Sequence, residues 1–252
     1  MGSTVPVKAI ETTFTILEAL QEYDEAGVSE LAAEVDLPRS TVFNHLKTLE
    51  EKEYVVNDDG SYRIGCRFLK LGTRARSLHR IYDIAKEEVD RVARETGEIS
   101  ALLVEEHGWG MFLHRAEGEQ AIHIDSFTGQ RIYLHGAALG KAILASLPRE
   151  RVDAIIDRRG LPALTDNTIT TRDALYRELD EVSDSGVALD DQERLTGLRS
   201  VAVPITGMDG TVLGAVSIAG PTSRIQDHRF TDEFPAKLRE TAKVIELDLK
   251  YS

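Results

Sequence analysis

The chain has 252 residues and carries 30 Lys and Arg against 43 Asp and Glu, a formal net charge of −13. This length suits two domains and lets folding bury roughly 70–75% of the unfolded chain's surface, so neither a metal nor a disulfide is needed for stability. The chain has a single cysteine, which excludes an internal disulfide framework. It has no apolar run of about 18 residues, which excludes a membrane-spanning helix, and no signal pattern. The sequence therefore predicts a cytoplasmic protein.

Positive charge is concentrated locally in this acidic chain. Residues 1–62 carry 4 Lys and Arg against 13 Asp and Glu, whereas residues 63–80 carry six cations and no acid. Arginine also outnumbers lysine, 21 to 9. Abundant acid with scarce lysine resembles the composition of halophilic proteins, whose self-repulsion is screened over a few ångströms by concentrated salt.

Two helices are predicted before residue 37. The first covers residues 8–23, with Ile10, Phe14, Leu17 and Leu20 on its apolar stripe. Ser29 is a suitable N-cap for a short second helix over residues 30–36.

The segment Leu37–Leu49 has the pattern of a DNA-reading helix. Val42 and Leu46 lie on its apolar stripe, and its polar face contains no carboxylate although the chain is strongly acidic. We expect Asn44 and Lys47 to enter the major groove, because an Asn amide can form two hydrogen bonds with adenine. The other residues assigned to DNA contact on this helix, mainly to the backbone, are Arg39, Ser40, Thr41 and Thr48.

A hairpin follows this helix, because Asp59-Gly60 separates two β-prone runs. Three helices followed by a hairpin predict a winged helix-turn-helix over residues 1–65. Arg63, beside the wing, is assigned to phosphate or the minor groove, with a solvated surface charge as the alternative. Residues 66–82 then form a cationic linker helix, and residues 83–252 form a second domain.

The second domain is predicted to be α+β with a mainly antiparallel sheet. Strand pairs are expected at 99–105 with 111–115, at 120–127 with 131–135, and at 201–205 with 212–218, each around a turn that contains glycine. The expected helices before, between and after these pairs cover residues 84–97, 136–146, 151–159, 172–185 and 231–250, the last capped by Thr231.

The chain resembles the IclR-type transcriptional regulators over almost its whole length. The residues that carry the resemblance are Leu37-Pro-Arg-Ser-Thr-Val, Leu134-His-Gly-Ala-Ala-Leu-Gly-Lys-Ala and Asp190-Asp-Gln-Glu-Arg-Leu-Thr-Gly-Leu-Arg-Ser-Val-Ala-Val-Pro, in the family's order. The resemblance implies an N-terminal winged helix-turn-helix and a C-terminal effector domain with a GAF-like fold. It also implies homodimers, often paired into tetramers, on double-stranded operator DNA, and a small, commonly anionic metabolite as the effector.

The resemblance also implies where the effector binds. Small residues at 136–139 would in addition let a ligand approach backbone N–H groups at a helix N-terminus. This chain departs from the family at Ser200, where many relatives have Cys, at Ala219, where some have Ser, and at Asn44, where relatives often have Arg. The known effectors and operators therefore do not transfer. The implied effector-binding residues are Gly136, Ala137, Ala138, Leu139, Asp190, Ser200 and Ser217.

Enzymatic activity is not expected, because the sequence contains no nucleophile elbow, Walker loop or zinc-protease motif. No cofactor, membrane partner or metal site is assigned, although His123-Ile-Asp125 would place two metal-ligand types on one face of a strand. The sequence thus predicts a DNA-binding regulator controlled by a metabolite. A regulator without an effector and a metal-responsive regulator are the alternatives.

Overall fold

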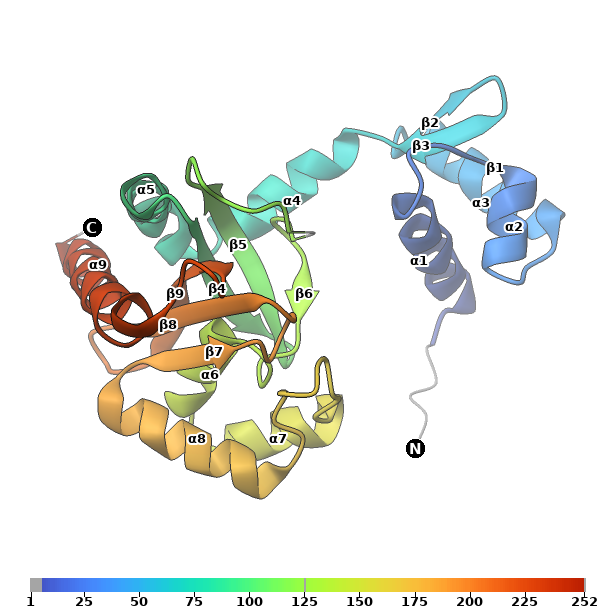
Figure 1. Ribbon diagram of the computed structural model, residues 1–252. Helices are drawn as coiled ribbons and strands as arrows, with labels where there is room; N and C mark the ends of the chain where they lie inside the picture. The colour runs from blue at the N-terminus through green and yellow to red at the C-terminus, as the bar shows by residue number, and fades with distance from the viewer. Residues whose placement is uncertain (1–5, 125, 252) are drawn as a thin grey trace. The chain divides into compact units, whose positions relative to one another are not determined.

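The computed structural model describes residues 6–124 and 126–251, and the chain divides after Ala75 into two compact units (Figure 1). Each unit has its own hydrophobic core, the first built on three helices and a small sheet, the second on both faces of a larger sheet. Within the described ranges, no helix combines the length and apolar character that crossing a membrane requires.

The first unit is a winged helix-turn-helix, as predicted. The strands β1, β3 and β2 form an antiparallel sheet in that order, with Val55 opposite Ile64. Asp59 and Gly60 both adopt positive φ in the predicted hairpin turn, 50° and 92°. The elements are α1 (Lys8–Gln21), β1 (Ala26–Gly27), α2 (Val28–Glu34), α3 (Arg39–Glu51), β2 (Val55–Asp58), β3 (Ser61–Ile64) and the greater part of α4 (Arg67–Ser77).

The first half of the apolar stripe predicted for α1 is wrong. Leu17 and Leu20 are buried as predicted. Ile10 and Phe14 are instead 55% and 57% exposed, and Ile16 is buried in the core. The polar residue Thr13 also lies on the inner face of the helix, where its hydroxyl contacts a histidine of α3. The inner face is therefore rotated about the helix axis relative to the first half of the predicted apolar stripe. The predicted cap of α2 is wrong as well: the helix begins at Val28, directly after β1, so Ser29 lies inside it.

The predicted linker helix 66–82 corresponds to α4 and the start of α5 (Arg80–Thr96). The two helices are separate because His79 adopts an extended backbone before α5. Every residue of α4 is exposed or half-buried, whereas α5 buries Ile81 and Val89 on its inner stripe. The break between the two helices therefore falls where the apolar residues begin to pack against the sheet of the second unit.

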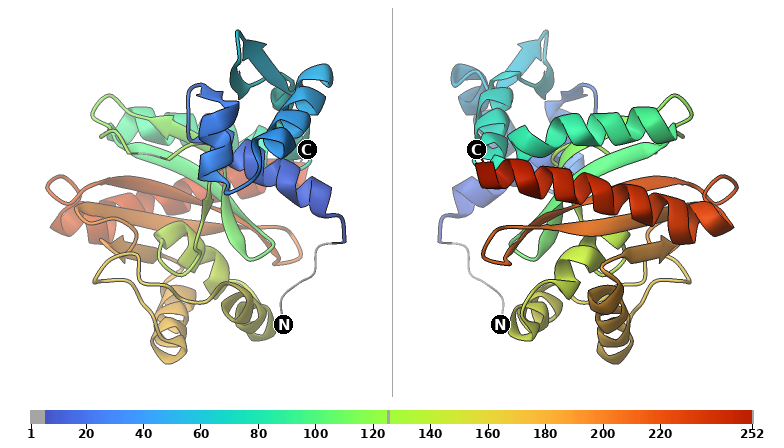
Figure 2. Two further views of the ribbon diagram at one scale, coloured as in Figure 1. Left: turned by 90° about the vertical axis from the view of Figure 1, so that its right-hand side faces the viewer. Right: turned by 90° about the vertical axis from the view of Figure 1, so that its left-hand side faces the viewer.

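The second unit is α+β, as predicted. Its antiparallel sheet has the order β6-β5-β4-β9-β8-β7, and helices cover both faces (Figures 1 and 2). Side chains alternate along each strand, so Leu102 packs towards α5 and α9 while Ala101 and Leu103 face α6, α7 and α8. Besides α5, the elements are β4 (Ile99–Glu106), β5 (Trp109–Glu117), β6 (Arg131–Ile132), α6 (Ala138–Ala145), α7 (Arg149–Arg159), α8 (Arg172–Ser185), β7 (Ala188–Asp191), β8 (Leu198–Thr206), β9 (Val212–Pro221) and α9 (Phe234–Tyr251).

Two expectations for this sheet are corrected. The pair 120–127 with 131–135 is not formed: the described part of 120–127 contains no strand, and the short β6 pairs with β5 instead, with Ile132 opposite Gly110. The edge strand β7 was not predicted; among the described strands its partner is β8. Both differences arise because partners distant in the chain decide which segment becomes a strand.

The last helix also begins differently from the prediction. A π-helical turn over Arg229–Glu233 precedes α9, and the hydroxyl of Thr231 contacts Asp227 and Asp232 instead of capping the helix. Pro235 occupies the first turn of α9, where a proline is tolerated. The inward stripe of α9 is buried at Leu238 and Ile245, as the sequence pattern predicts.

Candidate functional site

The polar face of α3 is presented to solvent. Val42 and Leu46 are fully buried against the rest of the first unit, which turns the opposite side of the helix outwards. Thr41 is half-buried, at the edge of this face. The residues assigned to DNA contact that are exposed on α3 are Arg39, Ser40, Asn44, Lys47 and Thr48.

Two side chains of α3 are held by hydrogen bonds within the unit. His45 faces α1, with its Nδ1 2.8 Å from the hydroxyl oxygen of Thr13. The hydroxyl of Thr48 donates to the backbone carbonyl of Asn44 at 2.8 Å, so its proton is already engaged within the helix. His45 therefore fixes α3 on α1 and leaves the polar face free for a partner.

Two further residues complete this surface. Arg63 lies exposed on β3, opposite Val56 of β2. Phe43, which the sequence analysis did not single out, is 44% exposed and borders the face of Asn44 and Lys47. Its signal in the sequence was an apolar residue outside the stripe of Val42 and Leu46.

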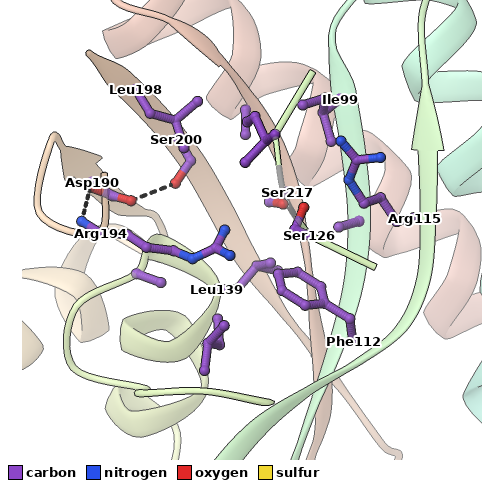
Figure 3. A pocket seen from close by; sticks show the side chains of 15 residues that line it. Ile99, Phe112, Arg115, Ser126, Leu139, Asp190, Arg194, Leu198, Ser200 and Ser217 are labelled. Carbon is purple, nitrogen blue, oxygen red and sulfur yellow. Dashed lines mark hydrogen bonds between the residues drawn. The ribbon is translucent and has the colours of Figure 1, made fainter. Parts of the chain in front are cut away.

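The second unit contains a cavity on the α6 side of its sheet, with about 450 Å³ of empty space including the open mouth (Figure 3). Small side chains on neighbouring strands leave this room: Ala101 of β4 lies opposite Ser217 of β9, and Ser200 of β8 lies opposite Ala219 of β9. Apolar side chains form most of the wall. The polar lining residues are Arg115, Ser126, Asp190, Arg194, Ser200 and Ser217.

Asp190 is the buried acid of the cavity. Its Oδ1 accepts the backbone N–H of Glu193 at 2.8 Å, and its Oδ2 accepts the hydroxyl of Ser200 at 3.1 Å. Burial raises the pKa of the Asp190 carboxyl, although these hydrogen bonds and the charge of Lys141 act in the opposite direction. The strand pairing of β7 with β8 places Asp190 directly opposite Ser200, so the two groups form one polar patch.

Two arginines also line the cavity, and the sequence analysis missed both. Arg115, near the end of β5, has a side chain that is only 10% exposed; its Nη1 pairs with Glu117. The Nε and Nη2 atoms of Arg115 are buried and have no hydrogen-bond partner among the described residues. Arg194, in the turn after β7, has its guanidinium carbon 5.4 Å from the ring centroid of Phe112.

Arg194 is half-buried. Burial is the main cause that lowers the pKa of Arg194; the positive charge of Arg115 acts in the same direction and Asp190 opposes it. In Figure 3, Arg194 reaches into the cavity from one side and Arg115 lies on the other, with Ser126 and Ser217 between them. The cavity is thus lined by two cationic side chains.

The residues implied as effector contacts divide into two groups. Gly136 and Ala138 are outside the cavity lining, so their placement does not support the expected ligand contact. Ala138 is fully buried in the core, and a Cβ on Gly136 would lie 2.7 Å from the side chain of Leu164, so both positions serve packing. The implied residues that do line the cavity are Ala137, Leu139, Asp190, Ser200 and Ser217.

A buried charge cluster adjoins the cavity. Lys141 of α6 is fully buried, and its Nζ lies 2.6 Å from a carboxylate oxygen of Glu178 and 2.6 Å from one of Glu193. Burial raises the pKa of Glu193 to about 7; Lys141 opposes this rise, whereas the negative charges of Asp190 and Glu178 add to it. The turn after β7 therefore contributes Asp190 and Arg194 to the cavity and Glu193 to the cluster.

The possible metal ligands do not gather in the part of the chain that the structure describes: no group of three or more His, Cys, Asp or Glu residues there could hold a metal ion. His123 is exposed, and Asp125, the second half of the pair considered from the sequence, lies outside the described residues.

Comparison with known proteins gives matches over both units. Residues 9–59 match the family described as IclR helix-turn-helix domain, and residues 73–247 match Bacterial transcriptional regulator IclR C-terminal. The chain is 32% identical over 253 residues to the probable HTH-type transcriptional regulator ArcR of Halobacterium salinarum, a match that covers 99% of this chain and 96% of that protein.

Solved structures agree with this assignment. The crystal structure of IclR from Thermotoga maritima superposes with a TM-score of 0.81 at 30% identity, covering 97% of this chain and 99% of that one. An IclR homolog from Microbacterium hydrocarbonoxydans complexed with 4-hydroxybenzoate has the same fold, with a TM-score of 0.80 at 24% identity and coverage of 95% and 100%. The chain therefore belongs to the IclR family of transcriptional regulators, and its winged helix-turn-helix is the DNA-binding domain.

Proposed function

We propose that this regulator binds double-stranded operator DNA in the cytoplasm as a homodimer, that dimers pair on the operator, and that a small organic metabolite in the cavity controls operator affinity. The observation that supports control by a metabolite is the cavity itself. Its small side chains leave room beside the buried pair Asp190 and Ser200. An apolar pocket with a few converging polar groups is the usual form of a small-molecule site.

The resemblance of fold adds support for this class of ligand. The Microbacterium homolog is a complex with 4-hydroxybenzoate, a small organic acid. The proteins that this chain resembles are named as regulators, which agrees with a role that requires no catalysis.

The DNA contacts proposed for α3 follow from its exposed face. Asn44 and Lys47 would reach base edges in the major groove, and Arg39, Ser40, Thr41 and Thr48 would hold the helix on the backbone. Arg63 would contact phosphate or the minor groove beside the wing. The exposure of Asn44 and Lys47 opposite the buried stripe of α3 supports this assignment.

Control by a metabolite requires that the ligand binds two arrangements of the dimer with different affinity. Such coupling is typically about 1–3 kcal/mol, or about 5–150-fold in operator affinity. Fluorescence anisotropy with a fluorescently labelled duplex from the gene's own upstream region would measure it, with sugar acids, short keto acids and aromatic acids added in turn.

The expected result is a change of at least about 5-fold with one of these compounds, together with a rise in melting temperature. Operator binding that no compound changes would refute metabolite control and favour a regulator without an effector. Loss of operator affinity on adding a chelator, restored by a divalent metal, would favour the metal-responsive alternative.

A further inference from the structure

Phe43 is an apolar side chain at the border of the polar face of α3. It is 44% exposed, whereas its neighbour Val42 is fully buried. The described core of the first unit includes Val42 and Leu46 of this helix, with the half-buried Leu49 packed against it, but it does not include Phe43. A single exposed apolar residue is ordinary on a protein surface. This one borders the surface assigned to DNA, so a bound duplex would cover it.

Phe43 lies at the middle of the surface that α3 presents. Arg39 precedes it by four residues and Lys47 follows it by four, so the three exposed side chains form one row along the helix. Asn44 is the next residue, rotated by about 100° around the helix axis and displaced by about 1.5 Å along it. The ring of Phe43 and the amide of Asn44 therefore start from the same turn of α3. We expect a base pair that Asn44 reaches to lie within range of Phe43.

The major groove offers an aromatic ring one apolar partner. Its base edges carry hydrogen-bond donors and acceptors, apart from the C5-methyl group of thymine. A ring placed against a donor or an acceptor would take water from that group and return no hydrogen bond, which costs free energy. A ring placed against the methyl group removes apolar surface of both partners from water, which is favourable. Thymine is also the pairing partner of the adenine that an Asn amide reads.

We propose that Phe43 contacts the C5-methyl group of a thymine in the operator, within one base-pair step of the adenine read by Asn44, and so determines a preference for thymine at that position. This inference rests on the placement of α3 in the major groove proposed above, and it adds a specificity-determining residue to that contact. Such a contact distinguishes thymine from uracil by one methyl group. Burying one methyl group typically changes affinity by about 4-fold.

The test removes the methyl group from the DNA and the ring from the protein, separately and together. Each thymine of the footprinted operator is replaced in turn by uracil, which has the same hydrogen-bonding groups and lacks the methyl group. Fluorescence anisotropy at constant salt concentration gives the affinity of the full chain for each duplex, for the parent, for Phe43→Ala, for Phe43→Leu and for the control Phe14→Ala. Phe14 is 57% exposed on α1, so the control removes the same type of side chain from another helix of the first unit.

The expected result is that the parent loses about 4-fold in affinity at one thymine, or at one in each half-site of a palindromic operator. The control Phe14→Ala should lose affinity at the same thymine. Phe43→Ala should bind the unmodified duplex more weakly than the parent and lose nothing further when that thymine becomes uracil. Phe43→Leu keeps an apolar side chain and should retain part of the loss. Because the contact is uncharged, the salt dependence of binding should be the same in Phe43→Ala as in the parent.

Three results would overturn the inference: uracil weakens the parent at no thymine position, Phe43→Ala loses affinity at the same thymine as the parent does, or Phe43→Ala binds the unmodified operator as tightly as the parent. A ring that acts only in the fold or in contacts between protein chains would give the second result, since it would change the affinity for all duplexes alike. Failure of the proposed function looks different. In that case Asn44→Ala also leaves affinity and base preference unchanged, whereas failure of the inference alone leaves the effect of Asn44→Ala intact.

Discussion

Replacing Lys141 by Met should destabilise the second unit strongly. The side chain of Lys141 is fully buried, and its ammonium lies 2.6 Å from one carboxylate oxygen each of Glu178 and Glu193. Methionine has a similar length and would fill the same space, so the change removes the charge without leaving a large cavity. What remains is the buried carboxyl of Glu193, whose Oε2 already has no partner among the described residues.

The magnitude follows from the loss of one partner of a buried ion pair, which typically costs about 3–5 kcal/mol. At about 2–4 °C per kcal/mol for a domain of 150–250 residues, the melting temperature should fall by about 6–20 °C. The loss should be larger at pH 8 than at pH 6. Burial and the neighbouring acids already hold the pKa of Glu193 at about 7, so this carboxyl binds a proton at pH 6 and must be buried as an anion at pH 8.

The assay is thermal unfolding of the full chain, followed by circular dichroism at both pH values. Lys243→Met is the matched control, because Lys243 is exposed on α9 and its replacement should change stability by no more than about 0.5 kcal/mol. The double variant Lys141→Met with Glu193→Gln should regain part of the loss at pH 8. A loss below about 1 kcal/mol for Lys141→Met, or no recovery in the double variant, would refute the reasoning.

Four further outcomes are expected. Asn44→Ala should weaken operator binding by about 1–3 kcal/mol and relax the sequence preference at one base pair. Footprinting on a set of single-base operator variants would measure both, and unchanged affinity and preference would contradict the assignment of Asn44. The raised pKa of Glu193 makes the free energy of unfolding fall as pH rises from about 4.5 to about 7, so denaturant titrations at pH 5 and pH 8 should differ less for Glu193→Gln than for the parent. Gly140→Ala should lower the free energy of unfolding by at least about 1–3 kcal/mol, because its Cβ would lie 2.1 Å from the carbonyl oxygen of Leu134. The control Gly72→Ala, in the exposed α4, places its Cβ within 4 Å of no atom of the described structure and should be neutral or stabilising. The acidic, lysine-poor composition predicts a higher melting temperature in molar KCl than in low salt, and equal melting temperatures would exclude a salt requirement.

The features that could be predicted from the sequence are those with a local cause. The wing turn at Asp59-Gly60 depends on two adjacent residues that tolerate positive φ, and both adopt it. The helix Arg172–Ser185 was predicted with its observed bounds, because Thr171 caps its start and Gly186 ends it in the left-handed conformation.

The features that were missed depend on partners distant in the chain. The edge strand Ala188–Asp191 is only four residues long, and its pairing with β8 decides its conformation. The first half of the apolar stripe of α1 was misplaced because the contact of Thr13 with His45 joins residues that are 32 positions apart. Periodicity alone gives weight to apolar residues and cannot anticipate a polar contact on the inner face.

The arginines of the cavity show the same limit for the candidate site. An arginine near the end of a strand is normally read as a surface residue. Arg115 faces the cavity because the strand register sets it opposite Ala101, which in turn lies opposite Ser217. Lys141 does have a signal in the sequence, because a single lysine within the apolar run of α6 requires a buried acid as its partner. The sequence does not reveal which acid this is: Glu193, 52 positions later, is one of its partners.

The location of charge in this protein bears on how it recognises DNA. The segment up to residue 62 carries 4 cations against 13 acids, yet its polar face on α3 exposes Arg39 and Lys47 with Asn44. We therefore expect long-range attraction to phosphate to be weak, and counterion release to come mainly from these two cations and the six of residues 63–80. On this proposal, affinity rests more on the fit of α3 in the groove and on base contacts. A ligand that changes the distance between the two α3 helices of a dimer would then act directly on the main source of affinity.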